Sequence, residues 1–169
     1  LQKIIGDVAY RINIFTFHSF CESVIKDFPF YFKKFGGAKV LNDLERVEIL
    51  EEILKTNDFS ELVTFNDQFY FLKDIVRAIN NLKKEGLSPT EFEGSIPKWE
   101  KSLLADEDIF YKRDYGEYKK GDIKPAEKEK IEHKIKKVNE LAVVFDLYQK
   151  ELEKKGRYDF SDMILSVLS

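Results

Sequence analysis

Apolar residues recur at helical spacing along most of this chain. The clearest case is the segment from residue 125 to about residue 155, whose apolar positions recur at steps of four and three: Ile131, Ile135, Val138, Ala142 and Phe145. Such steps place side chains on one face of a helix, so this segment predicts a long helix that faces a core. The same spacing predicts shorter helices over residues 1–10, 19–27, 42–56, 67–85, 96–110 and 157–169.

Short polar motifs predict where several of these helices begin and end. Ser19 is expected to cap the helix over residues 19–27, and Asn42 begins a sequence typical of a capping box. Ser88 is followed by proline and, two residues later, by glutamate, which is a strong local signal for a helix start. Gly86 and Gly156 are expected to end the helices that precede them.

One segment has the pattern of a strand instead. Residues 11–17 alternate, with Ile12, Ile14 and Thr16 on one side and Asn13, Phe15 and Phe17 on the other. A lone strand cannot satisfy its own edges, so its partner strands are expected outside this chain. The predicted fold class is therefore mainly α, a helical bundle with one short orphan strand near the N-terminus.

Composition limits the class of protein. The 169 residues are 43% hydrophobic and 35% charged, which suits a single domain with a real core and much helix surface. The one cysteine excludes an internal disulfide and a cysteine-based zinc site. There is no signal-peptide pattern and no apolar run near about 18 residues, so we expect no membrane partner and a cytoplasmic location.

Charge is distributed unevenly around a net value of −3. Residues 111–137 contain ten Lys and Arg against six Asp and Glu. Because binding responds to local potential, this basic strip could meet phosphate groups on an otherwise acidic protein. The simpler alternative is a solvated helix face of mixed charge. The chain begins at Leu1 and ends within an amphipathic pattern, so we expect a fragment of a longer protein.

Few side chains are candidates for catalysis. His18, Cys21 and His133 fall short of a zinc-ligand set, and a Cys–His nucleophilic pair would lack an orienting third group. Asp159 and Asp162 could bind magnesium or act as acid and base, although an aspartate before an apolar helix is more often a cap. No G-x-x-x-x-G-K-[ST] loop occurs, so this chain alone is not expected to hydrolyse a nucleotide by that route.

Thr16, His18 and Ser19 are the polar residues at the junction of the predicted strand and helix. Backbone N–H groups at a helix start favour an anion, and these three side chains add further donors. Together they could hold one backbone phosphate of a nucleic acid without contacting its bases. Equally, they could do no more than cap the helix.

Two motifs enclose most of the chain. INIFTFHSFCESVI, residues 12–25, resembles the T-F-H-[SG] region of UvrD/Rep-type superfamily 1 DNA helicases. GRYDFSDMILSVL, residues 156–168, resembles the D-F-x-D-L-[LI] element of that family. Three stretches between them are also similar in kind: VLNDLERVEILEEILK, INNLKKEGLSPTEFE and VFDLYQKELEKKGRYDF. The five occur in the family's order and cover nearly the whole chain.

The resemblance implies a division into three parts. Residues 1–18 would be the tail of the first RecA-like motor domain, residues 19–157 a helical domain of the 1B type, and residues 158–169 the return into the motor domain. The parent protein would be an ATP-dependent 3′–5′ DNA helicase that uses ATP and magnesium. This part, which lacks the phosphate loop, would hold no cofactor or metal and would not be catalytic.

The resemblance also assigns roles and partners. Thr16, His18 and Ser19 would contact single-stranded DNA, while Asp159, Phe160 and Asp162 would form a structural hinge and cap. On charge alone, Lys119, Lys120 and Lys124 are candidates for contacts to the duplex backbone at a DNA junction. The other partners would be the remaining helicase domains of the same polypeptide.

Three alternatives stay open at this point. The parent could be a helicase–nuclease of the RecB or AddA kind, whose motifs look similar. The chain could instead be a free-standing helical module that binds a partner protein through aromatic surface patches. Finally, it could be a small hydrolase that uses Asp159, Asp162 and His18.

Overall fold

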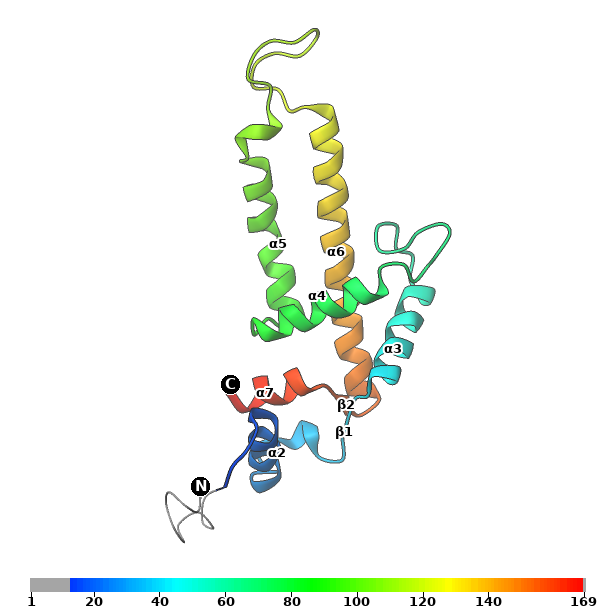
Figure 1. Cartoon of the computed structure of the whole chain (residues 1–169), viewed down its shortest axis with the longest axis vertical. Helices are drawn as coiled ribbons and strands as arrows, with labels where there is room; N and C mark the ends of the chain where they lie inside the picture. The colour runs from blue at the N-terminus through cyan, green and yellow to red at the C-terminus, as the bar shows by residue number, and fades with distance from the viewer. Residues whose placement is uncertain (1–12, 169) are drawn as a thin grey trace, which may run out of the picture. The chain divides into compact units, whose positions relative to one another are not determined.

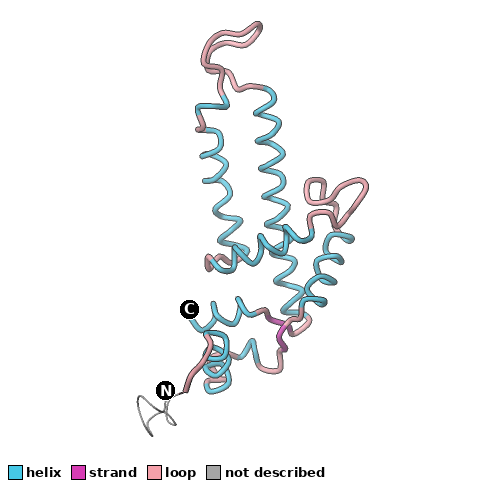
Figure 2. The backbone as a smooth tube through the Cα atoms, viewed as in Figure 1, coloured by secondary structure: helices cyan, strands magenta, loops and turns pink. Residues whose placement is uncertain are grey.

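The computed structural model describes residues 13–168, and helices make up most of them (Figures 1 and 2). The predicted mainly α fold class is therefore confirmed. The helix expected over residues 1–10 lies outside the described residues. The chain divides into two compact units, one formed by residues 13–41 together with residues 156–168 and the other by residues 42–155.

The first unit joins the two ends of the described chain. Its elements are α2 (Phe17–Asp27), η2 (Lys33–Phe35), β1 (Lys39–Val40), β2 (Arg157–Tyr158) and α7 (Phe160–Leu168). Helix α2 packs against α7 around the buried side chains of Cys21, Phe35 and Met163. The predicted boundary after residue 18 falls inside α2, whereas the structure groups all of α2 with α7.

The strands β1 and β2 form a parallel pair in which Lys39 lies opposite Arg157 and Val40 opposite Tyr158. The N–H of Lys39 donates to the carbonyl oxygen of Gly156 (3.0 Å), and that of Leu41 donates to Tyr158 (2.8 Å). Gly156 has a φ of +60°, a conformation that glycine adopts without strain, so the chain can turn from helix into strand there.

The strand predicted over residues 11–17 is wrong over its described part. Residues 13–16 have no regular secondary structure, and α2 already begins at Phe17; residues 11 and 12 lie outside the described part. Alternation alone favours a strand only where a neighbouring strand accepts its hydrogen bonds, and none pairs with residues 13–16.

The second unit consists of four α-helices and a short 3-10 turn: α3 (Asp43–Thr56), α4 (Leu72–Lys84), α5 (Pro89–Leu104), η3 (Glu107–Ile109) and α6 (Pro125–Lys154). Figure 1 shows α5 and α6 side by side, connected at one end by residues 105–124. The other half of α6 packs against α3. Side chains buried between these helices include Ile53, Leu54, Val144, Phe145 and Leu152.

Most of the predicted helix ends in this unit are close to the observed ones. Asn42 and Ser88 both form complete capping boxes, with their side chains accepting from the N–H three residues on. Two predictions differ. Helix α4 begins at Leu72 rather than residue 67, because Thr64 and Asp67 hold a hydrogen-bonded turn before it. The helix expected over residues 96–110 is not separate: residues 96–104 are the second half of α5, which runs unbroken from Pro89 to Leu104, and a 3-10 turn at Glu107–Ile109 follows.

Candidate nucleic-acid interface

The start of α2 is held by two hydroxyl groups. Thr16 Oγ1 accepts from the N–H of Ser19 (3.2 Å), and Ser19 Oγ donates to the carbonyl oxygen of Thr16 (3.0 Å). Thr16 is therefore the cap, and the prediction that Ser19 caps this helix is wrong, because the helix begins two residues earlier. The Thr16 side chain is nevertheless exposed and that of Ser19 half-buried, so both remain within reach of a ligand.

His18 connects the two sequence motifs. Its ring contacts the ring of Phe160 edge to face, with 5.0 Å between the ring centres and 81° between the planes. The T-F-H-S segment and the D-F-S-D segment, far apart in sequence, therefore meet in one unit. Both rings are exposed, so the contact lies at the surface.

Asp159 and Asp162 form a reciprocal cap at the start of α7. Asp159 Oδ1 accepts from the N–H of Asp162 (2.9 Å), and Asp162 Oδ2 accepts from the N–H of Asp159 (3.2 Å). The side chain of Asp159 is only 2% exposed. Both carboxylates thus bind backbone donors at a helix start, which is a structural arrangement. Within residues 13–168, no three His, Cys, Asp or Glu side chains cluster as a metal site would require.

Residues 107–124, here called the arm tip, make up most of the connection between α5 and α6 and form a hairpin. Phe110 pairs with Ile123 in an antiparallel bridge, and the N–H of Tyr111 donates to Asp122 (2.9 Å). A tighter turn lies further out, where Tyr115 and Tyr118 exchange two backbone hydrogen bonds of 2.9 and 3.0 Å. Gly116 has a φ of +59° within this turn, a value that other residues adopt only with strain.

Three tyrosines stack on this hairpin. The ring of Tyr111 lies nearly parallel to that of Tyr115 (6.1 Å, 10°) and to that of Tyr118 (5.1 Å, 14°). Tyr115 remains 67% exposed and Tyr118 38% exposed. Aromatic rings that are both stacked and exposed are suited to stacking on a further flat group.

Two acidic side chains of the arm tip, those of Asp114 and Asp122, hydrogen-bond to its backbone. Asp122 accepts from the N–H of Lys119 (2.7 Å), and Asp114 accepts from the N–H of Lys120 (2.8 Å). In the described part of the chain, the ammonium groups of these two lysines form no salt bridge. The two lysines therefore make the surface potential of the arm tip positive.

The remaining predicted lysine is held differently. Lys124 Nζ donates to the carbonyl oxygen of Asp108 (2.7 Å), while the carboxylate of Asp108 pairs with Lys112 (2.9 Å). The hydrogen bond and positive charge of Lys112 lower the pKa of Asp108, so this carboxylate stays ionised. The ammonium of Lys124 is thus held in place by a carbonyl oxygen and not by a carboxylate.

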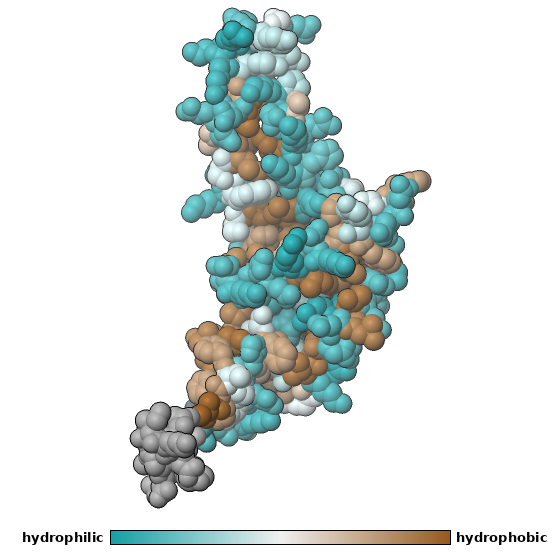
Figure 3. Space-filling model, in the orientation of Figure 1, coloured by the Kyte–Doolittle hydropathy of each residue, from teal (hydrophilic) through white to brown (hydrophobic). Residues whose placement is uncertain are grey.

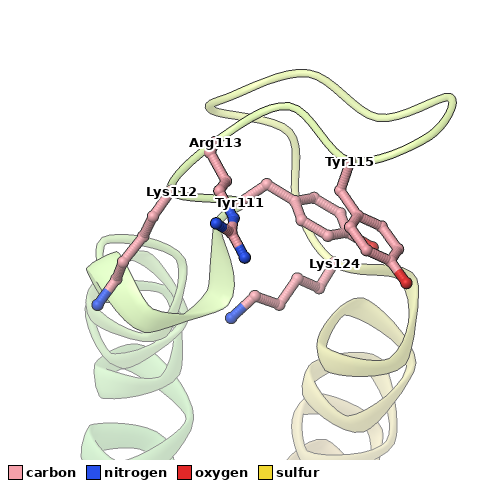
Figure 4. A pocket seen from close by; sticks show the side chains of 5 residues that line it. All are labelled: Tyr111, Lys112, Arg113, Tyr115 and Lys124. Atoms are coloured by element: carbon pink, nitrogen blue, oxygen red, sulfur yellow. The ribbon is translucent and has the colours of Figure 1, made fainter.

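Beside these residues lies an open cavity of about 290 Å³, lined by Tyr111, Lys112, Arg113, Tyr115 and Lys124 (Figure 4). In that view the side chains of Arg113 and Lys124 point toward one another below the ring of Tyr111. A second open cavity, of about 510 Å³, includes Lys120 in its lining. The tip therefore combines ring faces with cations around a hollow surface.

The predicted site residues fall into two groups. Thr16, His18 and Ser19 share a unit with Asp159, Phe160 and Asp162, whereas the three lysines belong to the arm tip. The sequence reasoning missed the tyrosines and Arg113. A signal was present in YKRDYGEYKKGD, where two glycines among closely spaced tyrosines indicate a hairpin that brings rings together.

No helix in the described part of the chain is long and apolar enough to cross a membrane. Neither a curated protein nor a solved structure matches the chain. A family model, that of the UvrD/REP helicase N-terminal domain, matches residues 1–169. Since this match includes both motifs and everything between them, the chain belongs to the UvrD/REP helicase family.

Proposed function

We propose that this chain is the DNA-contacting 1B-type part of an ATP-dependent 3′–5′ DNA helicase. The observation that carries the proposal is the arm tip, which is ordered by its own hydrogen bonds and exposes Lys119 and Lys120. Ammonium groups without carboxylate partners favour phosphates, and phosphate contacts dominate DNA affinity. In this role the arm tip contacts the duplex backbone near a junction, while Thr16, His18 and Ser19 contact the single strand.

ATP and magnesium belong to the parent protein in this proposal. The chain has no G-x-x-x-x-G-K-[ST] loop, and its aspartates at the start of α7 already bind backbone N–H groups. No residue of this chain is therefore assigned to nucleotide hydrolysis. Its contribution is to bind and orient DNA.

The surface of the first unit supports contacts with other helicase domains. Figure 3 shows hydrophobic residues gathered over part of this unit. The large hydrophobic side chains exposed there include Ile14, Phe17, Phe20, Phe28, Phe30 and Tyr31. A surface of this kind is unfavourable in water and is commonly covered by another domain. We propose that the motor domain covers it.

Salt-dependent DNA binding tests the proposal. The chain should bind a junction of duplex and single strand, and its affinity should fall steeply with salt because counterions are released. Replacing both Lys119 and Lys120 by Gln removes two phosphate contacts, so the slope of log K against log salt should become shallower by about 1.8. Fluorescence anisotropy over a salt series measures both quantities.

Lys73→Gln with Lys84→Gln is the matched control, because it removes the same charge from exposed positions of α4. This control should keep the wild-type slope. An affinity that does not change with salt, or an equal loss of slope in both double variants, would contradict the proposal.

A further inference from the structure

Stacked rings and cations meet in one cavity at the arm tip. We propose that this cavity holds a single unpaired nucleotide, with its base on the open face of Tyr115 and its phosphate between Arg113 and Lys124. The inference rests on the proposed function, since it requires that the arm tip meets DNA. It adds a specific ligand class, an unstacked base, to a surface that would otherwise contact only backbone phosphates.

The rings provide a preformed platform. Tyr115 stacks against Tyr111 through one face and is 67% exposed, so its second face is open to solvent. The backbone hydrogen bonds between Tyr115 and Tyr118 hold the turn that carries the ring. A base that stacks there extends an existing stack, and little ring freedom remains to be lost on binding.

The cations provide a place for the phosphate. Arg113 is exposed, and within residues 13–168 no group accepts a hydrogen bond from its guanidinium or pairs with it. Lys124 is oriented by the carbonyl oxygen of Asp108 and points toward Arg113 (Figure 4). Two cations that point toward one another repel, and an anion between them relieves that repulsion while gaining charge-assisted hydrogen bonds.

The exposed ring of Tyr115 and the two cations beside it favour unpaired DNA over a duplex. Base faces inside a duplex are covered by their neighbours, so only a frayed, flanking or single-stranded base can lie on Tyr115. Tyr111 and Tyr115 line the same cavity as Arg113 and Lys124. One nucleotide can therefore contact a ring and the two cations together.

Fluorescence of 2-aminopurine tests this directly, because the base is quenched when it stacks on an aromatic ring. The 169-residue chain is titrated into a hairpin duplex that carries 2-aminopurine either in a short overhang or paired within the stem. We expect quenching only for the overhang probe. Tyr115→Leu should abolish that quenching and weaken overhang binding by about 5-fold to 100-fold, whereas Tyr115→Phe keeps the ring and should retain both.

Two further variants distinguish the phosphate contact of Arg113 from the ring contact of Tyr115. Arg113→Gln should reduce affinity and make the salt slope shallower by about 0.7, the value for a single-strand phosphate, while leaving the quenching at saturation intact. Tyr70→Leu is the matched control, because Tyr70 is 66% exposed and lies outside the arm tip. It should behave as wild type.

The outcomes distinguish this inference from the proposed function. If the chain binds DNA in a salt-dependent manner but Tyr115→Leu leaves quenching and affinity unchanged, the nucleotide site is overturned and the proposed function stands. Equal quenching of overhang and paired probes also overturns it. If neither probe binds at any salt concentration, the proposed function itself fails.

Discussion

At Asp159, one buried carboxylate closes the start of α7 and fixes where the chain turns out of β2. Its Oδ1 accepts from the N–H of Asp162, whose own carboxylate returns a bond to the N–H of Asp159. Backbone groups at a helix start have no partner within the helix, so these bonds replace water that burial excludes. The D-F-S-D segment is thus a folding signal in this chain.

Substitution of Asp159 should therefore reduce stability. Asp159→Ala removes the cap and leaves the N–H of Asp162 without this acceptor, so we expect the free energy of unfolding to fall by about 1–2 kcal/mol. Asp159→Asn retains an acceptor oxygen and should lose less. Urea denaturation followed by circular dichroism measures the difference, and an alanine variant as stable as wild type would contradict this role.

At the scale of elements, Glu140 ties a long loop to α6. Its carboxylate accepts from the backbone N–H groups of Ser60, Glu61 and Leu62, each at 2.9 Å, and from the Ser60 hydroxyl at 3.0 Å. Burial alone would raise the pKa of Glu140, but these hydrogen bonds outweigh it and hold the pKa below its usual value. The loop before α4 is thus anchored by one charged side chain.

This anchor makes a pH-dependent contribution to stability. Because the pKa of Glu140 is lowered in the folded state, its contribution is fully present above the ordinary value of 4.5 and is lost as the pH falls through the folded pKa. Glu140→Gln should cost about 1–3 kcal/mol at neutral pH. The difference from wild type should shrink at acidic pH in urea titrations.

Glu132→Gln is the control for that series, because Glu132 lies on the same helix and, among residues 13–168, pairs only with the exposed Lys128 (3.9 Å). It should change stability little at any pH. If the Glu140→Gln variant lost the same free energy of unfolding at neutral and at acidic pH, the charge of the carboxylate would not be the cause of that loss.

Elements with local signals could be predicted from the sequence, whereas elements that depend on distant partners could not. The capping boxes at Asn42 and Ser88 lie within four residues of chain, so their residues alone indicate them. The strand expected over residues 11–17 is not found in its described part, because alternation says nothing about a missing partner strand. The β1–β2 pair was missed for the opposite reason, since two-residue strands have no pattern to detect.

In the candidate site, too, the residues with a local sequence signal could be predicted and those that depend on distant contacts could not. The lysines of the arm tip are evident from composition, because charge can be counted along the chain. The tyrosine stack depends on how the hairpin folds back: Tyr111 stacks on Tyr118 across a hairpin in which Phe110 pairs with Ile123. Sequence spacing therefore indicates the cations but not the ring platform beside them.

For the whole molecule, the division into two units predicts that one folds by itself. Residues 42–155 are continuous in sequence, and their core consists of their own side chains, including Leu54, Val144 and Phe145. An isolated chain with its own core is expected to fold independently. Residues 42–155 expressed alone should give a helical circular dichroism spectrum and a cooperative thermal transition.

A shorter piece provides the control. Residues 42–145 lack Tyr148 and Leu152, which are 1% and 0% exposed, so this piece loses part of the α3–α6 contact and should melt without cooperativity. Gradual melting of both pieces would contradict an independent unit.

The parallel pairing of β1 with β2 makes residues 42–155 an insertion that leaves and re-enters the first unit at one place. Leu41, where the chain departs, and Gly156, where it comes back, are both bonded to one short ladder. In the register of this pair Leu41 lies three residues further along than Gly156. With a rise of about 3.3 Å per residue and a strand spacing of about 4.8 Å, the two joints are about 11 Å apart. Residues 42–155 can therefore become longer or shorter in evolution without a change in the first unit, because Leu41 and Gly156 keep their positions.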